Sequence, residues 1–139
     1  RLYQSREFED DFPEETARFA NVEFAPKLKD RAQSLSAMRE AMFGAHVFDA
    51  AVFIGGMAGI VDEYRLLLDR QPRTKMLPIY STGGAVLNLA ALGAPDNEPL
   101  RADMNYVRLF QEALDVSPME HRFPTPADQP AEKRQRFRN

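Results

Sequence analysis

The chain has 139 residues, of which 44% are hydrophobic and 28% charged, with a net charge of -3 at pH 7. These values are typical of one globular domain that is large enough to fold alone. The negative charge argues against a duplex-binding surface, which needs basic residues in excess. Because there is no cysteine, disulfides, thiolate nucleophiles and thiolate metal sites are excluded. No apolar run reaches the roughly 20 residues of a membrane span, so we expect a cytoplasmic protein.

The N-terminal quarter predicts short elements. Residues 1–3 resemble the end of a strand, residues 13–20 predict a short helix, and residues 22–25 predict an edge strand. Residues 27–31 predict a solvated charged loop. Since Arg1 is not an initiator Met and begins directly in a strand, we expect the chain to be a piece of a longer protein.

A helix is predicted over residues 34–45, with Ser34 or Ser36 as its N-cap. At 100° per residue, one apolar stripe of this helix is formed by Leu35, Met38 and Met42. Arg39 falls inside that stripe. Three interpretations stay open for its guanidinium: it reaches water along its own stem, it forms a structural ion pair, or it contacts a ligand.

The sequence is organised around an apolar run, residues 50–54, that ends in Gly55-Gly56 and passes directly into a helical pattern. The run does not alternate, so it predicts a parallel strand covered on both faces. The expected core face of the helix comprises Met57, Ile60, Val61, Tyr64, Leu67 and Leu68. On the same helical wheel Glu63 flanks this face, whereas Asp62 points to solvent. We expect the helix to end at Gln71-Pro72.

The order of apolar strand, glycine pair and helical pattern occurs a second time directly afterwards. Residues 75–80 predict a second strand, which ends in Ser81-Thr82-Gly83-Gly84 before a short apolar helix over residues 85–92. Two glycine-rich turns at the ends of adjacent strands would line one crevice. Backbone amides and helix N-termini in such crevices suit phosphate groups.

The last part of the chain predicts a loop over residues 93–99 and a helix over residues 103–114. The domain is expected to span residues 1–116, followed by an extended or disordered tail, residues 117–139. The glycine turns match neither a dinucleotide-binding fingerprint nor a P-loop. A serine nucleophile lacks its G-x-S-x-G context, and no metal-ligand cluster is present.

Three motifs resemble those of the SLOG superfamily (Smf/DprA and LOG proteins), over roughly residues 2–114. They are Ser36-x-Met38-Arg39-x-x-Met42, Gly55-Gly56-Met57-x-Gly59-Ile60-x-x-Glu63 and Ser81-Thr82-Gly83-Gly84-Ala85. The chain is most similar to the bacterial branch related to the N-terminal sensing domains of melastatin-type channels. It departs from the cytokinin-activating relatives by one additional residue between the glycines and by Ile60 in place of Thr. Either Asp62 or Glu63 could therefore match their glutamate, and the helical wheel favours Glu63.

The resemblance implies an α/β fold, Rossmann-like and three-layered, with a mainly parallel sheet whose first strand would precede Arg1. It implies that the domain binds a nucleotide or an ADP-ribose-like molecule, with Arg39 neutralising phosphate and Glu63 accepting ribose hydroxyls. The phosphate would lie on two glycine-rich segments: Gly55, Gly56, Met57 and Gly59, then Ser81, Thr82, Gly83 and Gly84. The alternative is a nucleoside-monophosphate phosphoribohydrolase, with Arg39 and Glu63 as catalytic residues. A homo-oligomer is expected. No cofactor, metal, membrane or nucleic-acid partner is expected.

Overall fold

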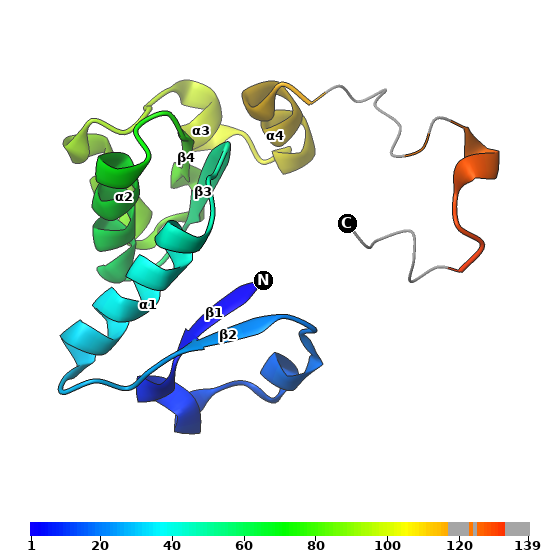
Figure 1. The fold of residues 1–139 in the computed structure, drawn as a ribbon. Coiled ribbons are helices and arrows are strands. Elements are labelled where there is room, and N and C mark those ends of the chain that lie inside the picture. Colours follow the sequence, from blue (N-terminus) through cyan, green and yellow to red (C-terminus); the bar gives the residue numbers. More distant parts are fainter. Residues whose placement is uncertain (117–122, 124, 133–139) are drawn as a thin grey trace. The chain divides into compact units, whose positions relative to one another are not determined.

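The computed structural model describes residues 1–116, 123 and 125–132. The chain divides into two compact units, residues 1–102 and residues 103–139, each of which is described by itself. Figure 1 shows that every strand found among the described residues belongs to the first unit. The expected tail, residues 117–139, lies largely outside the described residues.

The first unit holds two small parallel sheets. Strand β1 (Leu2–Ser5) pairs with β2 (Val22–Ala25), with Leu2 opposite Val22. Strand β3 (Ala50–Ile54) pairs with β4 (Lys75–Ile79), with Ile54 opposite Ile79. The fold is therefore mixed α/β with parallel strands, which confirms the Rossmann-like class.

Short 3-10 helices take up much of the loop between β1 and β2. They are η1 (Arg6–Asp11) and η2 (Glu14–Arg18), and η2 lies inside the helix predicted over residues 13–20. Phe12 stacks on Phe24 of β2 with ring centroids 5.7 Å apart, which fixes this loop against its own sheet.

Helix α1 (Arg31–Ala45) begins three residues earlier than predicted. Its N-cap is Asp30, whose carboxylate accepts a hydrogen bond of 2.9 Å from the amide of Gln33. The predicted serine caps are wrong, because both residues lie inside the helix. Ser34 is fully buried, and its hydroxyl donates to the Asp30 carbonyl and accepts from the amide of Leu28.

The two strands of the second sheet are covered differently. Strand β4 is buried from Met76 to Ile79. In β3 only Phe53 is buried, where its ring meets Tyr64 at 5.6 Å, whereas Ile54 on the opposite face is 59% exposed. The prediction that both faces of this strand are covered is therefore wrong. Only β4 pairs with β3 among the described residues.

Helix α2 (Gly59–Arg70) packs through three buried residues of the predicted core face, namely Ile60, Tyr64 and Leu67. Two other members of that face are exposed, Met57 by 82% and Leu68 by 41%. Met57 precedes the helix, so its side chain does not follow the helical wheel. The helix ends, as predicted, where Gln71 caps it.

After β4 the chain forms η3 (Tyr80–Thr82) and η4 (Gly84–Leu92), so the predicted short helix is present in 3-10 form. An unpredicted helix, α3 (Glu98–Ala102), follows within unit one. The amide of Leu100 donates to the side chain of Asn97, which begins this helix.

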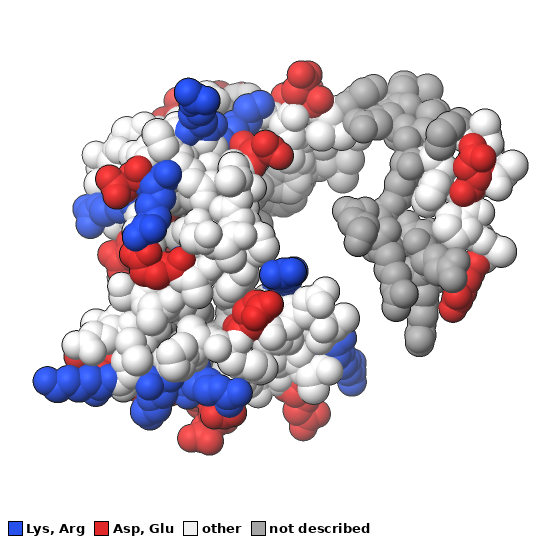
Figure 2. Space-filling model, viewed as in Figure 1, with Lys and Arg blue, Asp and Glu red and all other residues white. Residues whose placement is uncertain are grey.

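The second unit contains α4 (Tyr106–Leu114) and η5 (Pro126–Asp128). Asn105 caps α4, which starts three residues later than predicted, and Leu109 is its buried residue. None of the described helices combines the length and the apolar character needed to cross a membrane. On the face shown in Figure 2, acidic and basic side chains are interspersed over the first unit.

Candidate functional site

The two glycine turns lie against each other at the carboxyl ends of β3 and β4. The amide of Ala85 donates to the Gly56 carbonyl at 3.0 Å, and that of Val86 donates to the Gly55 carbonyl at 2.9 Å. The amide of Gly55 donates in return to the hydroxyl of Thr82 at 2.7 Å. The predicted juxtaposition is therefore present, and much of it is held by hydrogen bonds between the turns.

Residues 81–84 form the supporting turn. The hydroxyl of Thr82 donates to the Ile79 carbonyl at 2.5 Å, and the amide of Gly83 donates to the Tyr80 carbonyl at 3.0 Å. The donor of the Thr82 side chain is thus used inside the fold. Its role as a phosphate ligand stays a prediction.

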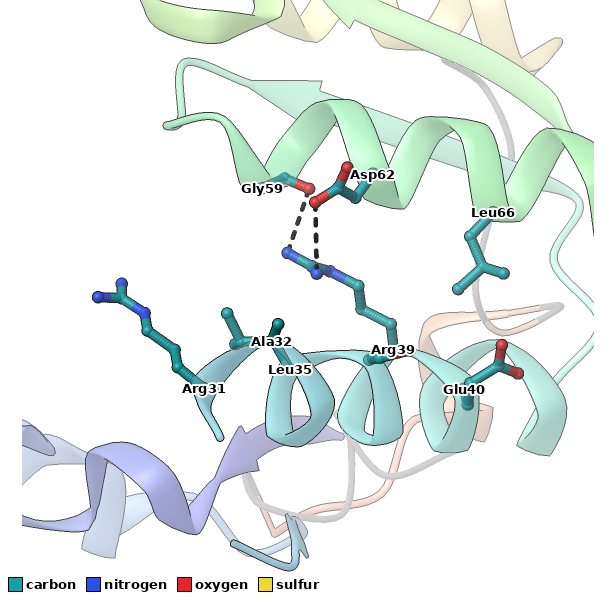
Figure 3. A pocket seen from close by; sticks show the side chains of 9 residues that line it. Arg31, Ala32, Leu35, Arg39, Glu40, Gly59, Asp62 and Leu66 are labelled. Atoms are coloured by element: carbon teal, nitrogen blue, oxygen red, sulfur yellow. Dashed lines mark hydrogen bonds and ion pairs between the residues drawn. The ribbon is translucent and has the colours of Figure 1, made fainter. Parts of the chain in front are cut away.

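Arg39 connects the middle of α1 to the first turn of α2. Its Nε donates to Oε1 of Glu63 at 3.3 Å, and its Nη2 donates to the Gly59 carbonyl at 3.3 Å. Its Nη1 lies 3.6 Å from Oδ2 of Asp62. Arg39 is only 8% exposed, so the guanidinium does not reach bulk water along its own stem, and that interpretation is wrong. The structural ion pair with Glu63 is present, and Figure 3 shows the contacts of the same guanidinium with Gly59 and Asp62.

Asp62 and Glu63 both lie within 4.0 Å of the same guanidinium. The side chain of Glu63 is 32% exposed, whereas that of Asp62 is 61% exposed. The helical wheel placed Asp62 in solvent, and it is exposed as predicted. It nevertheless contacts Arg39, because α1 lies along that side of α2. In Figure 3, Asp62 and Leu66 project from α2 toward α1, and Arg39 projects the other way.

Two clefts meet at Arg39. The larger, of about 700 Å³, lies where β3 passes into α2, and its lining includes Phe8, Ile54, Gly56, Met57, Gly59 and Glu63. The smaller, of about 590 Å³, lies between α1 and α2 and is lined by Asp62 in place of Glu63. Both are bordered by Arg31, Leu35, Arg39 and Gly59. We call the larger one the main cleft. Residues 81–84 are not among its lining residues.

Residues 1–114 match the family model described as the SLOG cluster3 family. The chain belongs to this family. No curated protein and no solved structure matches the chain significantly. Membership in the SLOG family indicates a domain for nucleotide-related binding or processing.

Sequence reasoning missed several lining residues of the main cleft of this SLOG domain, among them Phe8 and Arg31. Arg31 lies in the first turn of α1, and its guanidinium carbon is 4.9 Å from the ring centroid of Phe8. The spacing of Asp30 and Gln33 is a capping-box pattern, which would have placed Arg31 at the start of a helix instead of in a loop.

A polar cluster behind the second glycine turn fixes the end of β4 in the SLOG domain. The hydroxyl of Tyr80 donates to the Pro95 carbonyl at 3.1 Å, and Arg101 donates twice to Asp96, at 2.5 and 2.6 Å. The hydrogen bond from Arg101 lowers the pKa of the Asp96 carboxyl, while burial raises the pKa of Tyr80. The described residues contain no group of three acidic or histidine side chains that could hold a metal.

Proposed function

We propose that this SLOG domain binds a nucleotide or an ADP-ribose-like molecule in the main cleft, with a phosphate group at the start of α2. The observation that carries the proposal is the meeting of a glycine-rich turn, a helix N-terminus and two arginines, Arg31 and Arg39, around one cleft. Its volume of about 700 Å³ is of the size that small-molecule sites have.

The backbone of the turn supplies donors for phosphate. The amides of Gly56, Met57 and Ala58 make no hydrogen bond within the described part of the chain. They directly precede α2, whose N-terminus carries partial positive charge. Free amides at a helix N-terminus bind phosphate oxygens.

The remaining walls suit the other parts of a nucleotide. Ile54 and Met57 are exposed apolar side chains on the lining, where a base could bury them. Glu63 lies on the same lining, and its carboxylate accepts hydrogen bonds, as ribose hydroxyls require. In this proposal the second glycine turn, residues 81–84, holds the first in place.

Isothermal titration of the full chain with AMP, ADP and ADP-ribose tests the proposal. We expect saturable binding, weakened about tenfold in Arg31→Ala because one charged contact to phosphate is lost. Arg73→Ala is the matched control, since Arg73 is an exposed arginine after α2 that does not line the cleft. No heat with any of these ligands on folded protein, or equal affinities of the two variants, would contradict the proposal.

A second candidate is nucleoside-monophosphate phosphoribohydrolase activity. It is favoured by the position of Glu63, which lines the main cleft beside Arg39 and leaves about a third of its side chain exposed. A carboxylate in that place can polarise water and stabilise an oxocarbenium-like state. Release of free adenine from AMP, lost in Glu63→Gln, would support the activity. If the protein binds nucleoside monophosphates but releases no free base from any of them, the hydrolase candidate is excluded and only the binding function remains.

A homo-oligomer remains part of the proposal. The apolar segment η4 packs through Val86 and Leu89 and leaves Leu87 49% exposed, so one of its residues is available to a second copy. Sedimentation of the full chain at several concentrations tests this expectation.

A further inference from the structure

Arg39 is surrounded by more negative than positive charge. Its guanidinium carries one positive charge, and two carboxylates, those of Asp62 and Glu63, lie within 4.0 Å of it. Arg31 is the second cation on the lining of the main cleft. With both carboxylates in place, the charges of these four side chains cancel. This is an unfavourable setting for an anionic ligand.

The two carboxylates are not equivalent. Glu63 hydrogen-bonds to Arg39 at 3.3 Å and is the less exposed of the two. Asp62 is 61% exposed, and its 3.6 Å contact to Nη1 is too long for a good hydrogen bond. Because the Asp62 carboxylate is largely solvated and lies beyond hydrogen-bond distance, solvent screens its attraction to the buried guanidinium, and the contact contributes little to stability. Asp62 therefore contacts Arg39 without being needed to hold it.

Asp62 also weakens the second anion-binding element. It lies in the first turn of α2, where a carboxylate interacts favourably with the positive end of the helix. The same positive end is what would attract a ligand phosphate to Met57 and Ala58. One side chain thus competes with the ligand both for Arg39 and for the helix N-terminus.

We propose that Asp62 is a built-in competitor of the ligand phosphate, whose carboxylate keeps the affinity of the main cleft low by neutralising Arg39 and the start of α2. This inference rests on the proposed function and adds a residue that sets affinity. Substituting a residue that binds the ligand weakens binding. Removing the Asp62 charge should instead strengthen it.

The test compares Asp62→Asn with Asp69→Asn by isothermal titration with ADP-ribose and AMP. Asp69 is a matched control because it is an exposed carboxylate two turns further along the same helix, outside both clefts. We expect Asp62→Asn to bind about five- to tenfold more tightly than the unaltered chain, as a charge a few ångströms away is removed. Asp69→Asn should change the affinity less than twofold.

Three results would overturn the inference, and they separate it from the proposed function. Equal or weaker binding by Asp62→Asn, with the unaltered chain binding, refutes the competitor role and leaves the proposed function intact. An equal gain in affinity in Asp62→Asn and Asp69→Asn would mean that only the net charge of the protein matters. This result also refutes the competitor role. Absence of binding by all three proteins, each shown to be folded by its thermal transition, refutes the proposed function together with the inference.

Discussion

A Cβ atom on Gly59 would lie 2.6 Å from Nη2 of Arg39, so the guanidinium occupies the space that any other residue at position 59 would need. Glycine is unfavourable in a helix by about 1 kcal/mol relative to alanine. Its presence at the first residue of α2 is explained by the close approach of Arg39 to the Gly59 carbonyl.

Gly59→Ala should displace Arg39 and weaken ligand binding about tenfold, because the guanidinium no longer lies at the main cleft. Alanine favours the helix more than glycine does, but the variant loses the contacts of Arg39, so the free energy of unfolding should change little. Gly44→Ala in α1 is the control, since a Cβ there meets nothing within 4 Å. That variant should be stabilised by about 0.7 kcal/mol with unchanged affinity. Titration and thermal unfolding of both variants check this, and a stabilised Gly59→Ala with normal affinity would contradict it.

Gly84→Ala should destabilise the fold by about 3 kcal/mol. Gly84 has a φ of +70°, and a Cβ would lie 2.8 Å from the backbone oxygen of Gly56, so neither turn can relax without moving the other. Gly83 has a φ of +67° with open space around it, and Gly83→Ala should cost only about 1–2 kcal/mol. Urea unfolding compares the two variants. Equal losses would show that the contact between the turns does not matter.

The Arg39 and Glu63 pair should show a coupling energy of about 1 kcal/mol in a double-mutant cycle of Arg39→Met and Glu63→Gln. The value is modest because a third of the Glu63 side chain is exposed. Glu40 and Arg70 provide the control, since they also join α1 to α2 but are both more than 40% exposed. Their coupling should stay below about 0.5 kcal/mol. Equal couplings would mean that the pair at the main cleft is an ordinary surface contact.

The Asp96 and Arg101 contact should weaken in acid. Hydrogen bonding by Arg101 lowers the pKa of Asp96 in the folded protein, so the contact stabilises the fold above the unfolded-state pKa of about 4 and is lost as the pH falls through the folded-state value. A carboxyl NMR titration should show Asp96 titrating below the ordinary aspartate pKa of about 4. In Arg101→Gln this difference should disappear, and an unchanged midpoint would contradict the assignment.

The elements around the glycine turns could be predicted because the sequence itself marks them. Residues 50–54 and 75–79 are short apolar runs that end in glycine pairs, and both are parallel strands. The start of α1 was missed because residues 27–31 have no apolar periodicity, although Asp30 with Gln33 carries a capping signal. Helix α3 was missed because Pro99 was interpreted as a loop residue, whereas proline is acceptable in a first helical turn.

The candidate site could be predicted only in part. One helical wheel placed Arg39 in the apolar stripe of its helix, a second wheel placed Glu63 beside the core face of the next helix, and the structure joins the two residues by a hydrogen bond. The wheel of α2 missed the contact of Asp62 with Arg39. That contact depends on where α1 packs against α2, and a helical wheel describes one helix alone. The exposure of Ile54 was missed for a similar reason, because an apolar run does not show which face of the strand other elements cover.

The most direct test of the central claim is a crystal structure of the full chain soaked with ADP-ribose. Binding in the main cleft predicts density for a phosphate group within hydrogen-bond distance of the Met57 and Ala58 amides and beside Arg31. Density at another surface, or a main cleft that stays empty in crystals of protein that binds ADP-ribose in solution, would contradict the claim.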